Sequence, residues 1–302
     1  MKFCPEGTND SLAKKFNSLS EIKAAIDSRE IFEGRVLMCD REHNLHIDLG
    51  FMRGIIPRYE GAYGIIEGTV RDIALISKVG KRVCFRIMGF HRDENGNMWA
   101  VLSRRSVQID CIKEYINHLN PGDIVDTSVT HLEKFGAFID IGAGINSLIP
   151  IDMLSVSRIS HPAERLNEGR QIKAVLKSRE GGKLTFSLKE LLGTWQENAD
   201  LFSPGETVTG IVRSIEAYGV FVELTPNLAG LAEADENLKI GSRVSVYIKS
   251  IIPEKMKIKL VIVDAFDEIP NPEEPAYFIS ENHIDFWQYS PDGAVKDICT
   301  KF

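Results

Sequence analysis

Two short stretches of this sequence place aromatic side chains on either side of a glycine. They are Phe135-Gly136-Ala137-Phe138 and Tyr218-Gly219-Val220-Phe221. Rings of this kind can stand on a surface and stack on nucleic-acid bases, or they can turn inward and fill a core. Residues three apart in a regular strand point to opposite faces, but a bulge at Gly136 would bring Phe135 and Phe138 to one surface. Both interpretations stay open, and we favour stacking.

No residue pattern typical of catalysis or of metal binding accompanies these aromatic residues. The phosphate-binding patterns GxxxxGK[ST] and GxGxxG are absent, and so are HExxH and GxSxG. His43 and His46 have metal-ligand spacing, but acidic or thiol ligands do not accompany them in a convincing arrangement. The five cysteines never form CxxC, so we expect free thiols. We therefore expect no catalytic residue, no metal and no cofactor.

The two aromatic stretches occupy the same place in two copies of an internal repeat. NPGDIVDTSVTHLEKFGAFIDI (120–141) aligns without a gap with SPGETVTGIVRSIEAYGVFVEL (203–224). A looser copy contains EGRVLMCDREHNLHIDLG (33–50), in which His43 and His46 stand in place of the aromatic residues. The repeat is about 65–75 residues long, which suits a small barrel better than a solenoid.

The elements of each copy have the patterns of β-strands. In the second copy the strand-like segments are 125–131, 138–141, 147–151, 171–179 and 183–189. The last two form a predicted hairpin around Gly181-Gly182, where we expect positive φ angles. Five strands with a long connection between the third and the fourth predict an OB-fold barrel.

The predicted fold is all-β dominated, with three tandem five-stranded OB-fold barrels joined by short helical spacers. The predicted parts are an N-terminal tail and helix (1–30), a divergent first barrel (31–105), a helical spacer (106–120), a second barrel (121–189), a helical spacer (190–203), a third barrel (204–264) and an acidic, aromatic-containing tail (265–302). We expect residues 1–17 to be unstructured and a helix capped by Ser18 to follow through about Arg29. The aromatic tail predicts docking on a barrel or on a partner.

The charge of the chain is unevenly distributed. The net charge is −7, but the last part, 265–302, carries 2 basic against 8 acidic residues, whereas 34–105 carries 12 basic against 8 acidic residues. Because binding of a polyanion depends on the local field, the net charge does not exclude it. The first ten residues lack an apolar signal segment, and no run reaches the roughly 18–20 apolar residues that a membrane span needs. We expect a cytoplasmic protein without membrane contact.

The repeat resembles the S1 RNA-binding repeat, the OB-fold module of ribosomal protein S1. In the second copy the resemblance rests on Pro121-Gly122-Asp123, Phe135-Gly136-Ala137-Phe138, Leu148-Ile149 and Ser187-Leu188-Lys189. The three copies together cover residues 31 to about 264. The resemblance implies a short, three-repeat form of the ribosomal protein S1 family. Such a protein would bind single-stranded RNA without catalysis, typically mRNA on the small ribosomal subunit.

The resemblance also implies particular RNA-binding residues. They are Phe135, Phe138, Lys183, Arg179 and Lys189 in the second copy, and Tyr218, Phe221 and Lys257 in the third. The first copy offers weaker candidates, which can equally belong to a solvated face: His43, His46, Arg104 and Arg105. The third copy departs from the family pattern, because it lacks LSxK and carries Glu233 where the family often has a histidine.

Two other functions remain open at this point. One is a scaffold with degenerate repeats that docks on the ribosome or on another protein, which the acidic tail favours. The other is a subunit that carries RNA to a separate nuclease or modifying enzyme. The sequence does not give a base preference or an oligomeric state.

Overall fold

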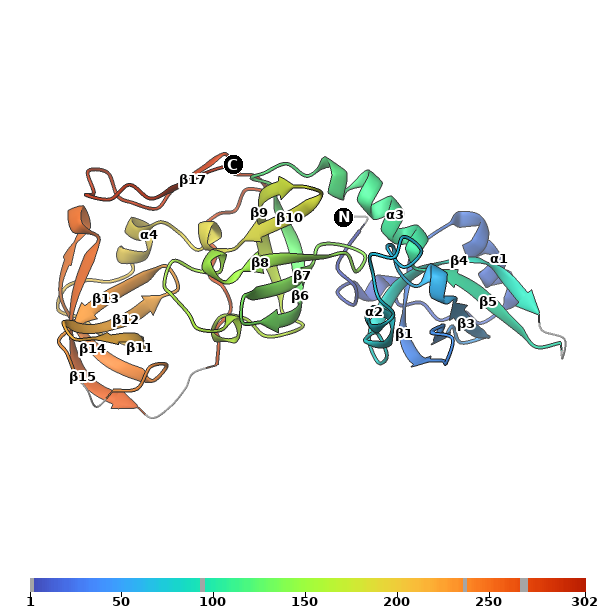
Figure 1. The fold of residues 1–302 in the computed structure, drawn as a ribbon, viewed down its shortest axis with the longest axis horizontal. Coiled ribbons are helices and arrows are strands. Elements are labelled where there is room, and N and C mark those ends of the chain that lie inside the picture. The colour runs from blue at the N-terminus through green and yellow to red at the C-terminus, as the bar shows by residue number, and fades with distance from the viewer. Residues whose placement is uncertain (1–2, 93–95, 236–237, 267–270) are drawn as a thin grey trace. The chain divides into compact units, whose positions relative to one another are not determined.

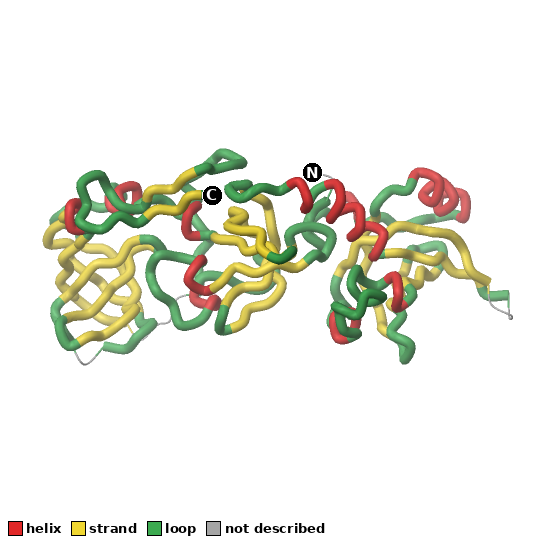
Figure 2. Tube along the Cα trace, turned by 45° about the horizontal axis from the view of Figure 1, so that its top comes forward, coloured by secondary structure: helices red, strands yellow, loops and turns green. Residues whose placement is uncertain are grey.

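The computed structural model describes residues 3–92, 96–235, 238–266 and 271–302. The strands β1 to β15 form three closed barrels of five strands each, and Figures 1 and 2 show these strands along the chain. The expected fold class, tandem OB-fold barrels, is therefore confirmed. By its internal contacts the chain divides into two units, one made of residues 1–119 and 140–146 and the other of residues 120–139 and 147–302.

The first barrel closes around a core of buried aliphatic and aromatic side chains. Its strands are β1 (Phe32–Cys39), β2 (Leu45–Asp48), β3 (Arg53–Ile56), β4 (Arg82–Arg92) and β5 (Met98–Ser103), in the order β1-β2-β3-β5-β4. β1 pairs with β4 to close the barrel, and β3 runs parallel to β5. The connection between β3 and β4 contains the short helices η2 (Arg58–Glu60) and α2 (Ile73–Ile76).

The expectation that residues 1–17 are unstructured is wrong for the described part of that segment. Phe3 and Phe16 are buried, and the ring of Phe16 lies 5.2 Å from that of Phe32 in an edge-to-face contact. A short helix, η1 (Asp10–Leu12), lies between them. Burying one phenylalanine stabilises the fold by about 1.5–3 kcal/mol, enough to order a short segment that has no periodic pattern. Residues 1–2 lie outside the described residues.

The helix predicted after this segment is present. α1 (Leu19–Ser28) begins after Ser18, whose hydroxyl accepts a hydrogen bond from the backbone N–H of Glu21. It ends at Arg29, which has a left-handed φ of 53°. Ile22 and Ala25 pack into the core of the first barrel.

The second barrel has the same strand arrangement. Its strands are β6 (Ile124–Glu133), β7 (Gly136–Asp140), β8 (Asn146–Pro150), β9 (Gln171–Glu180) and β10 (Lys183–Ser187), in the order β10-β8-β7-β6-β9. Gly181 and Gly182, between β9 and β10, have φ angles of 55° and 79°, as predicted. The long connection between β8 and β9 contains η4 (Ile151–Met153) and η5 (Pro162–Glu164).

The third barrel repeats the arrangement again. Its strands are β11 (Thr207–Glu216), β12 (Gly219–Thr225), β13 (Leu228–Ala232), β14 (Arg243–Ile252) and β15 (Lys257–Phe266), in the order β11-β12-β13-β15-β14. A one-turn helix, η7 (Pro253–Lys255), joins β14 to β15. Val222, Val246 and Leu260 lie in its buried core.

Short helices connect the barrels, as predicted. α3 (Arg105–Glu114) and η3 (Ile116–His118) precede the second barrel, whereas η6 (Lys189–Leu191) and α4 (Trp195–Ala199) precede the third. Thr194 and Glu197 form a capping box at the start of α4, and Trp195 is buried. Within the described ranges, no helix is long and apolar enough to cross a membrane.

The C-terminal tail docks on a barrel, one of the two arrangements expected. β16 (Phe286–Gln288) and β17 (Cys299–Lys301) pair as a two-stranded sheet, drawn in red in Figure 1. Trp287 and Tyr289 are buried in the hydrophobic core cluster of the third barrel. Of the predicted tail, residues 267–270 lie outside the described residues.

Candidate nucleic-acid interface

The aromatic pair of the second barrel lies at its surface. Phe135 is in the turn between β6 and β7, and Phe138 is in β7. Their ring centroids are 5.9 Å apart and the ring planes are nearly perpendicular, at 88°. The side chain of Phe135 is 56% exposed and that of Phe138 is half-buried. The pair therefore offers an exposed ring held against a second ring rather than two rings inside the core.

The third barrel presents the same pair with a different first residue. Tyr218 lies in the turn between β11 and β12, is 69% exposed and is followed by the half-buried Phe221 of β12. The two ring centroids are 6.2 Å apart, again at 88°. Phe135 and Tyr218 thus occupy equivalent turn positions, which explains how each reaches the ring three residues later without strict strand alternation.

The glycine between the aromatic residues lets a neighbouring strand approach closely. A Cβ atom on Gly136 would collide with the carbonyl oxygen of Ile149 in β8. A Cβ atom on Gly219 would collide in the same way with the carbonyl oxygen of Ala232 in β13. The N–H of Ile151 also donates to the carbonyl oxygen of Phe135 at 3.0 Å, which fixes the aromatic turn to the end of β8.

Strand register shows which residues lie beside the aromatic pair. In the third barrel Phe221 is opposite Leu231, Leu231 is opposite Lys259, and Lys259 is opposite Ser250. None of these four side chains is fully buried, so they form one surface row across four strands. Lys259 was not among the residues that the sequence predicted. It lies two residues after Lys257 on the same strand face, a relation that strand alternation could have revealed.

The second barrel has the corresponding row. Leu148 of β8 is opposite Thr185 of β10, and Thr185 is opposite Ser178 of β9. Lys183 lies two residues before Thr185, so its side chain is on the same face, as that of Lys257 is in the third barrel. Phe138 corresponds to Phe221 in the repeat alignment, which places it at the aromatic end of this row.

The predicted basic residues differ in exposure. Lys183 and Arg179 are exposed at the hairpin between β9 and β10, and Lys257 is exposed at the start of β15. Lys189 is half-buried, and its Nζ donates to the carbonyl oxygen of Asp152 at 3.2 Å. Because Lys183 and Arg179 are exposed whereas Lys189 is half-buried, they are better placed than Lys189 to meet a phosphate.

The two histidines of the first barrel face carboxylates. His46, in β2, has a side chain only 12% exposed, and its Nε2 lies 2.9 Å from Oδ2 of Asp40. Burial would raise the pKa of Asp40, but the hydrogen bonds from His46 and from Asn44 outweigh it and lower that pKa to about 2. His43, with a left-handed φ of 64°, has its Nδ1 3.6 Å from the carboxylate of Asp72. Neither ring stands in the exposed position that Phe135 occupies.

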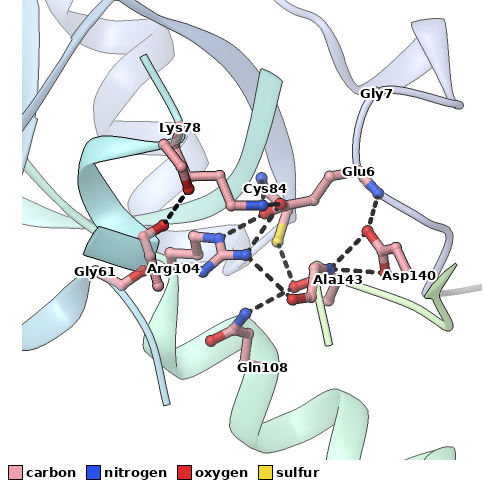
Figure 3. A network of polar contacts seen from close by, with 12 residues as sticks. Glu6, Gly7, Gly61, Lys78, Cys84, Arg104, Gln108, Asp140 and Ala143 are labelled. Carbon is pink, nitrogen blue, oxygen red and sulfur yellow. Dashed lines mark hydrogen bonds and ion pairs between the residues drawn. The ribbon is translucent and has the colours of Figure 1, made fainter. Parts of the chain in front are cut away.

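The two arginines at the end of the first barrel are both paired with carboxylates, but Arg104 is buried whereas the side chain of Arg105 is 23% exposed. Arg104 is 2% exposed; its Nε lies 2.6 Å from Oε1 of Glu6, and it also donates to the carbonyl oxygens of Gly61 and Gly144 (Figure 3). Nη2 of Arg105 lies 2.6 Å from Oε1 of Glu67. Because both guanidinium groups are engaged by internal partners, we leave them out of the interface proposed below.

Arg104 belongs to a buried network that the sequence did not reveal. Glu6 pairs with both Arg104 and Lys78, and the N–H of Glu6 donates to Asp140 at 2.8 Å (Figure 3). Burial would raise the pKa of Glu6, but the two cations outweigh it and lower that pKa. Burial and the charge of Glu6 raise the pKa of Asp140 to about 6, and burial raises that of Glu33 to about 7. The network ties the N-terminal segment to the first barrel.

Within the described residues, no group of three or more histidine, cysteine, aspartate or glutamate side chains is placed to hold a metal ion. The candidate interface consists of aromatic rings, basic side chains and strand backbone. These features define a protein of tandem OB-fold barrels, two of which carry a surface suited to stacking and phosphate contact.

Residues 118–187, which include the second barrel, match the family model of the S1 RNA binding domain. The chain is 28% identical over 254 residues to the small ribosomal subunit protein bS1 homolog of Bacillus subtilis (strain 168), covering 81% of this chain and 62% of the relative. It is 30% identical over 243 residues to the homolog of Bacillus cereus, covering 74% and 60%. It is 29% identical over 263 residues to bS1 of Staphylococcus aureus (strain COL), covering 81% and 64%. The predicted resemblance to the ribosomal protein S1 family is confirmed, and this chain spans less than two thirds of the length of these relatives.

Proposed function

We propose that this protein binds single-stranded RNA on its second and third barrels without catalysing a reaction. The observation that supports this most strongly is the matched pair of aromatic turns, with Phe135 and Tyr218 exposed at equivalent positions. An exposed ring adds little to a core, whereas stacking of a base on an aromatic side chain stabilises a complex by about 1–3 kcal/mol.

In the proposed complex, aromatic rings of each barrel stack on bases and basic side chains of the same barrel contact phosphates. On the second barrel, Phe135 and Phe138 stack on bases while Lys183 and Arg179 contact phosphates. On the third barrel the corresponding stacking residues are Tyr218 and Phe221, and the phosphate contacts are Lys257 and Lys259. Lys189 adds positive charge near the end of β10. The first barrel takes a smaller part, because His43 and His46 face carboxylates.

The RNA that we propose is mRNA, held in association with the small ribosomal subunit in the cytoplasm. The names of the similar bS1 proteins, which are small-subunit proteins, support this proposal. The proposed phosphate contacts predict that binding weakens as salt rises, because each such contact releases counterions.

A double substitution tests the role of the second barrel. Phe138→Ala with Lys183→Ala removes one stacking surface and one phosphate contact, and we expect the affinity for a single-stranded RNA oligomer to fall at least severalfold. Equilibrium binding measured by fluorescence anisotropy gives the affinity, and circular dichroism checks the fold. The control is Phe51→Ala with Lys23→Ala, two exposed residues of the first unit. A folded double variant that binds as tightly as the control would remove the second barrel from the interface.

A protein-docking scaffold is the alternative function. The internal partners of the histidines and arginines in the first barrel favour it, because that barrel offers few groups to RNA. The salt dependence of binding separates the two functions. An RNA binder loses affinity steeply as salt rises. A scaffold has little RNA affinity at any salt concentration and sediments with its protein partner after nuclease treatment.

A further inference from the structure

We propose that the second and third barrels are locked together as one rigid body that holds a single RNA strand across both faces. This inference rests on the RNA binding proposed above and adds how the two faces cooperate. The residues that carry it all belong to the unit made of residues 120–139 and 147–302.

The first lock is Asn227, in the turn between β12 and β13, whose side chain is fully buried. Its amide oxygen accepts from the N–H of Val156 at 3.0 Å. Its amide nitrogen donates to the carbonyl oxygens of Lys189 and Gly193 at 2.7 and 2.8 Å. Its own carbonyl oxygen accepts from the hydroxyl of Tyr289 at 2.7 Å. One residue therefore joins the second barrel, the spacer, the third barrel and the tail.

The second lock is a cluster of charged side chains shielded from water. Arg213 of β11 holds Glu223 of β12 through two hydrogen bonds of 2.8 and 2.9 Å. From the second barrel, Arg165 pairs with Glu223 and Glu164 pairs with Arg213. The side chains of Arg165, Arg213 and Glu223 are 7%, 7% and 4% exposed. Separating the barrels would leave the buried Arg165 without Glu223 and Arg213 without Glu164, so the cluster opposes independent motion.

The locks join the barrels end to end along their binding strands. The Phe135 turn lies at the end of β8, because Ile151 donates to its carbonyl oxygen. The chain leaving β8 then meets the third barrel, where the N–H of Ser157 donates to the carbonyl oxygen of Pro226 at 3.0 Å. Pro226 is in the β12–β13 turn, at the opposite end of β12 from Tyr218. The aromatic end of the second barrel therefore abuts the other end of the third.

The junction also borders the same surface of the third barrel that carries its aromatic pair. Phe221 and Glu223 are two residues apart in β12, so their side chains point to the same face, about 7 Å apart along the strand. Because Arg165 covers Glu223, the second barrel reaches the edge of the surface on which Phe221 stands. The β8–β9 connection of the second barrel therefore borders the binding face of the third barrel.

This arrangement suits one continuous strand. Because the aromatic end of the second barrel meets the far end of the third, the two aromatic turns lie at the same end of their barrels along the pair. We infer that a single RNA strand passes from one aromatic turn to the next across the junction. Because the barrels are already fixed, the second contact forms at a high effective concentration and little freedom is lost on binding.

The test compares RNA lengths in the full chain. One OB fold takes about 4–16 nucleotides, so a single-stranded oligouridine of about 4 nucleotides reaches one barrel, whereas one of about 32 nucleotides is long enough for both. We expect the wild-type protein to bind the longer oligomer at least about a hundredfold more tightly. Asn227→Ala removes one lock without touching either row. We expect it to bind the longer oligomer about tenfold more weakly than the wild type, with binding of the short oligomer changed less than about twofold.

Arg165→Ala removes the ion pair with Glu223 and should also weaken binding of the longer oligomer while leaving binding of the short oligomer nearly unchanged. This second variant tests the proposal if Asn227→Ala does not fold. Asn167→Ala, an exposed residue in the same connection, is the matched control and should behave as the wild type. If folded junction variants bind the longer oligomer as tightly as the wild type, the two barrels do not act as one rigid body. The proposed RNA binding would not be affected by this result. Failure of the wild type to bind either oligomer would instead refute the proposed function.

Discussion

At the scale of residues, the proposed interface depends on the position of one aromatic ring in each of the second and third barrels. Phe135 and Tyr218 are 56% and 69% exposed, so neither contributes much to the packing of a core. Each is nevertheless held in place, edge to face, against the ring three residues later. In the proposed complex, a ring that is already ordered and exposed loses less conformational entropy when it stacks on a base.

Substitutions at Tyr218 separate stacking from hydrogen bonding. The ring face, and not the hydroxyl, should contact the base, so we expect Tyr218→Phe to bind single-stranded RNA within about twofold of the wild type. Tyr218→Ala should bind at least severalfold more weakly, because the stacking surface is lost. Titration of a labelled oligomer gives both values. A large loss in Tyr218→Phe would show that the hydroxyl, rather than the ring, makes the contact.

At the scale of elements, the aromatic turn depends on close packing between neighbouring strands. Gly136 begins β7, and its missing side chain leaves room for the carbonyl oxygen of Ile149 in β8. Leu148 Cδ1 and Pro150 Cα would both lie only 3.1 Å from an added Cβ atom. The position of the Phe135–Phe138 pair therefore depends on this glycine as well as on the rings.

Gly136→Ala should disturb both stability and binding. The added methyl group meets backbone atoms that cannot move aside freely, so we expect a loss of about 1–3 kcal/mol in the free energy of unfolding. Chemical denaturation measures this loss. Gly89→Ala is the matched control, because an added Cβ atom there meets no atom within 4 Å. Equal stability of the two variants would mean that β7 and β8 separate easily.

The elements that could be predicted are those whose signals are local. Gly181-Gly182 gives a hairpin because only two residues need positive φ angles, and Ser18 caps a helix through a contact three residues away. That residues 3–16 adopt a defined structure could not be predicted in this way. Glu6 hydrogen-bonds to Asp140, which is 134 residues away in the sequence, and no local pattern reveals such a contact. Lys259 was missed for a different reason: the repeat alignment drew attention to Lys257 alone.

At the scale of the whole molecule, the net charge does not show which charged side chains face solvent and which are paired inside the protein. The chain carries −7 overall, yet several of its carboxylates are used internally, as in the network around Glu6. Glu33 faces Glu6, Arg82 and Asp140 in this network, and burial raises its pKa from the ordinary 4.5 to about 7. Protonation of this buried group is thus linked to the attachment of the N-terminal segment to the first barrel.

The pH dependence of stability should reveal this carboxyl group. The folded state holds the proton of Glu33 up to about pH 7, whereas the unfolded chain releases it near pH 4.5, so ionisation of Glu33 lowers stability as pH rises between these values. The difference corresponds to about 3 kcal/mol. Glu6, whose pKa is lowered, acts with the opposite sign and loses its stabilising effect only at acid pH.

Glu33→Gln should therefore flatten the fall in the free energy of unfolding between about pH 4.5 and 7. The amide oxygen can still accept from the N–H of Gly7, which lies 3.1 Å from both carboxylate oxygens. Urea denaturation at half-unit pH steps measures the slope, and the exposed Glu30→Gln serves as control. Asp140, whose pKa is also raised, leaves a smaller slope in the variant. An unchanged slope in Glu33→Gln would mean that Glu33 is already ionised in the folded protein near pH 5, and that water reaches it through the N-terminal segment.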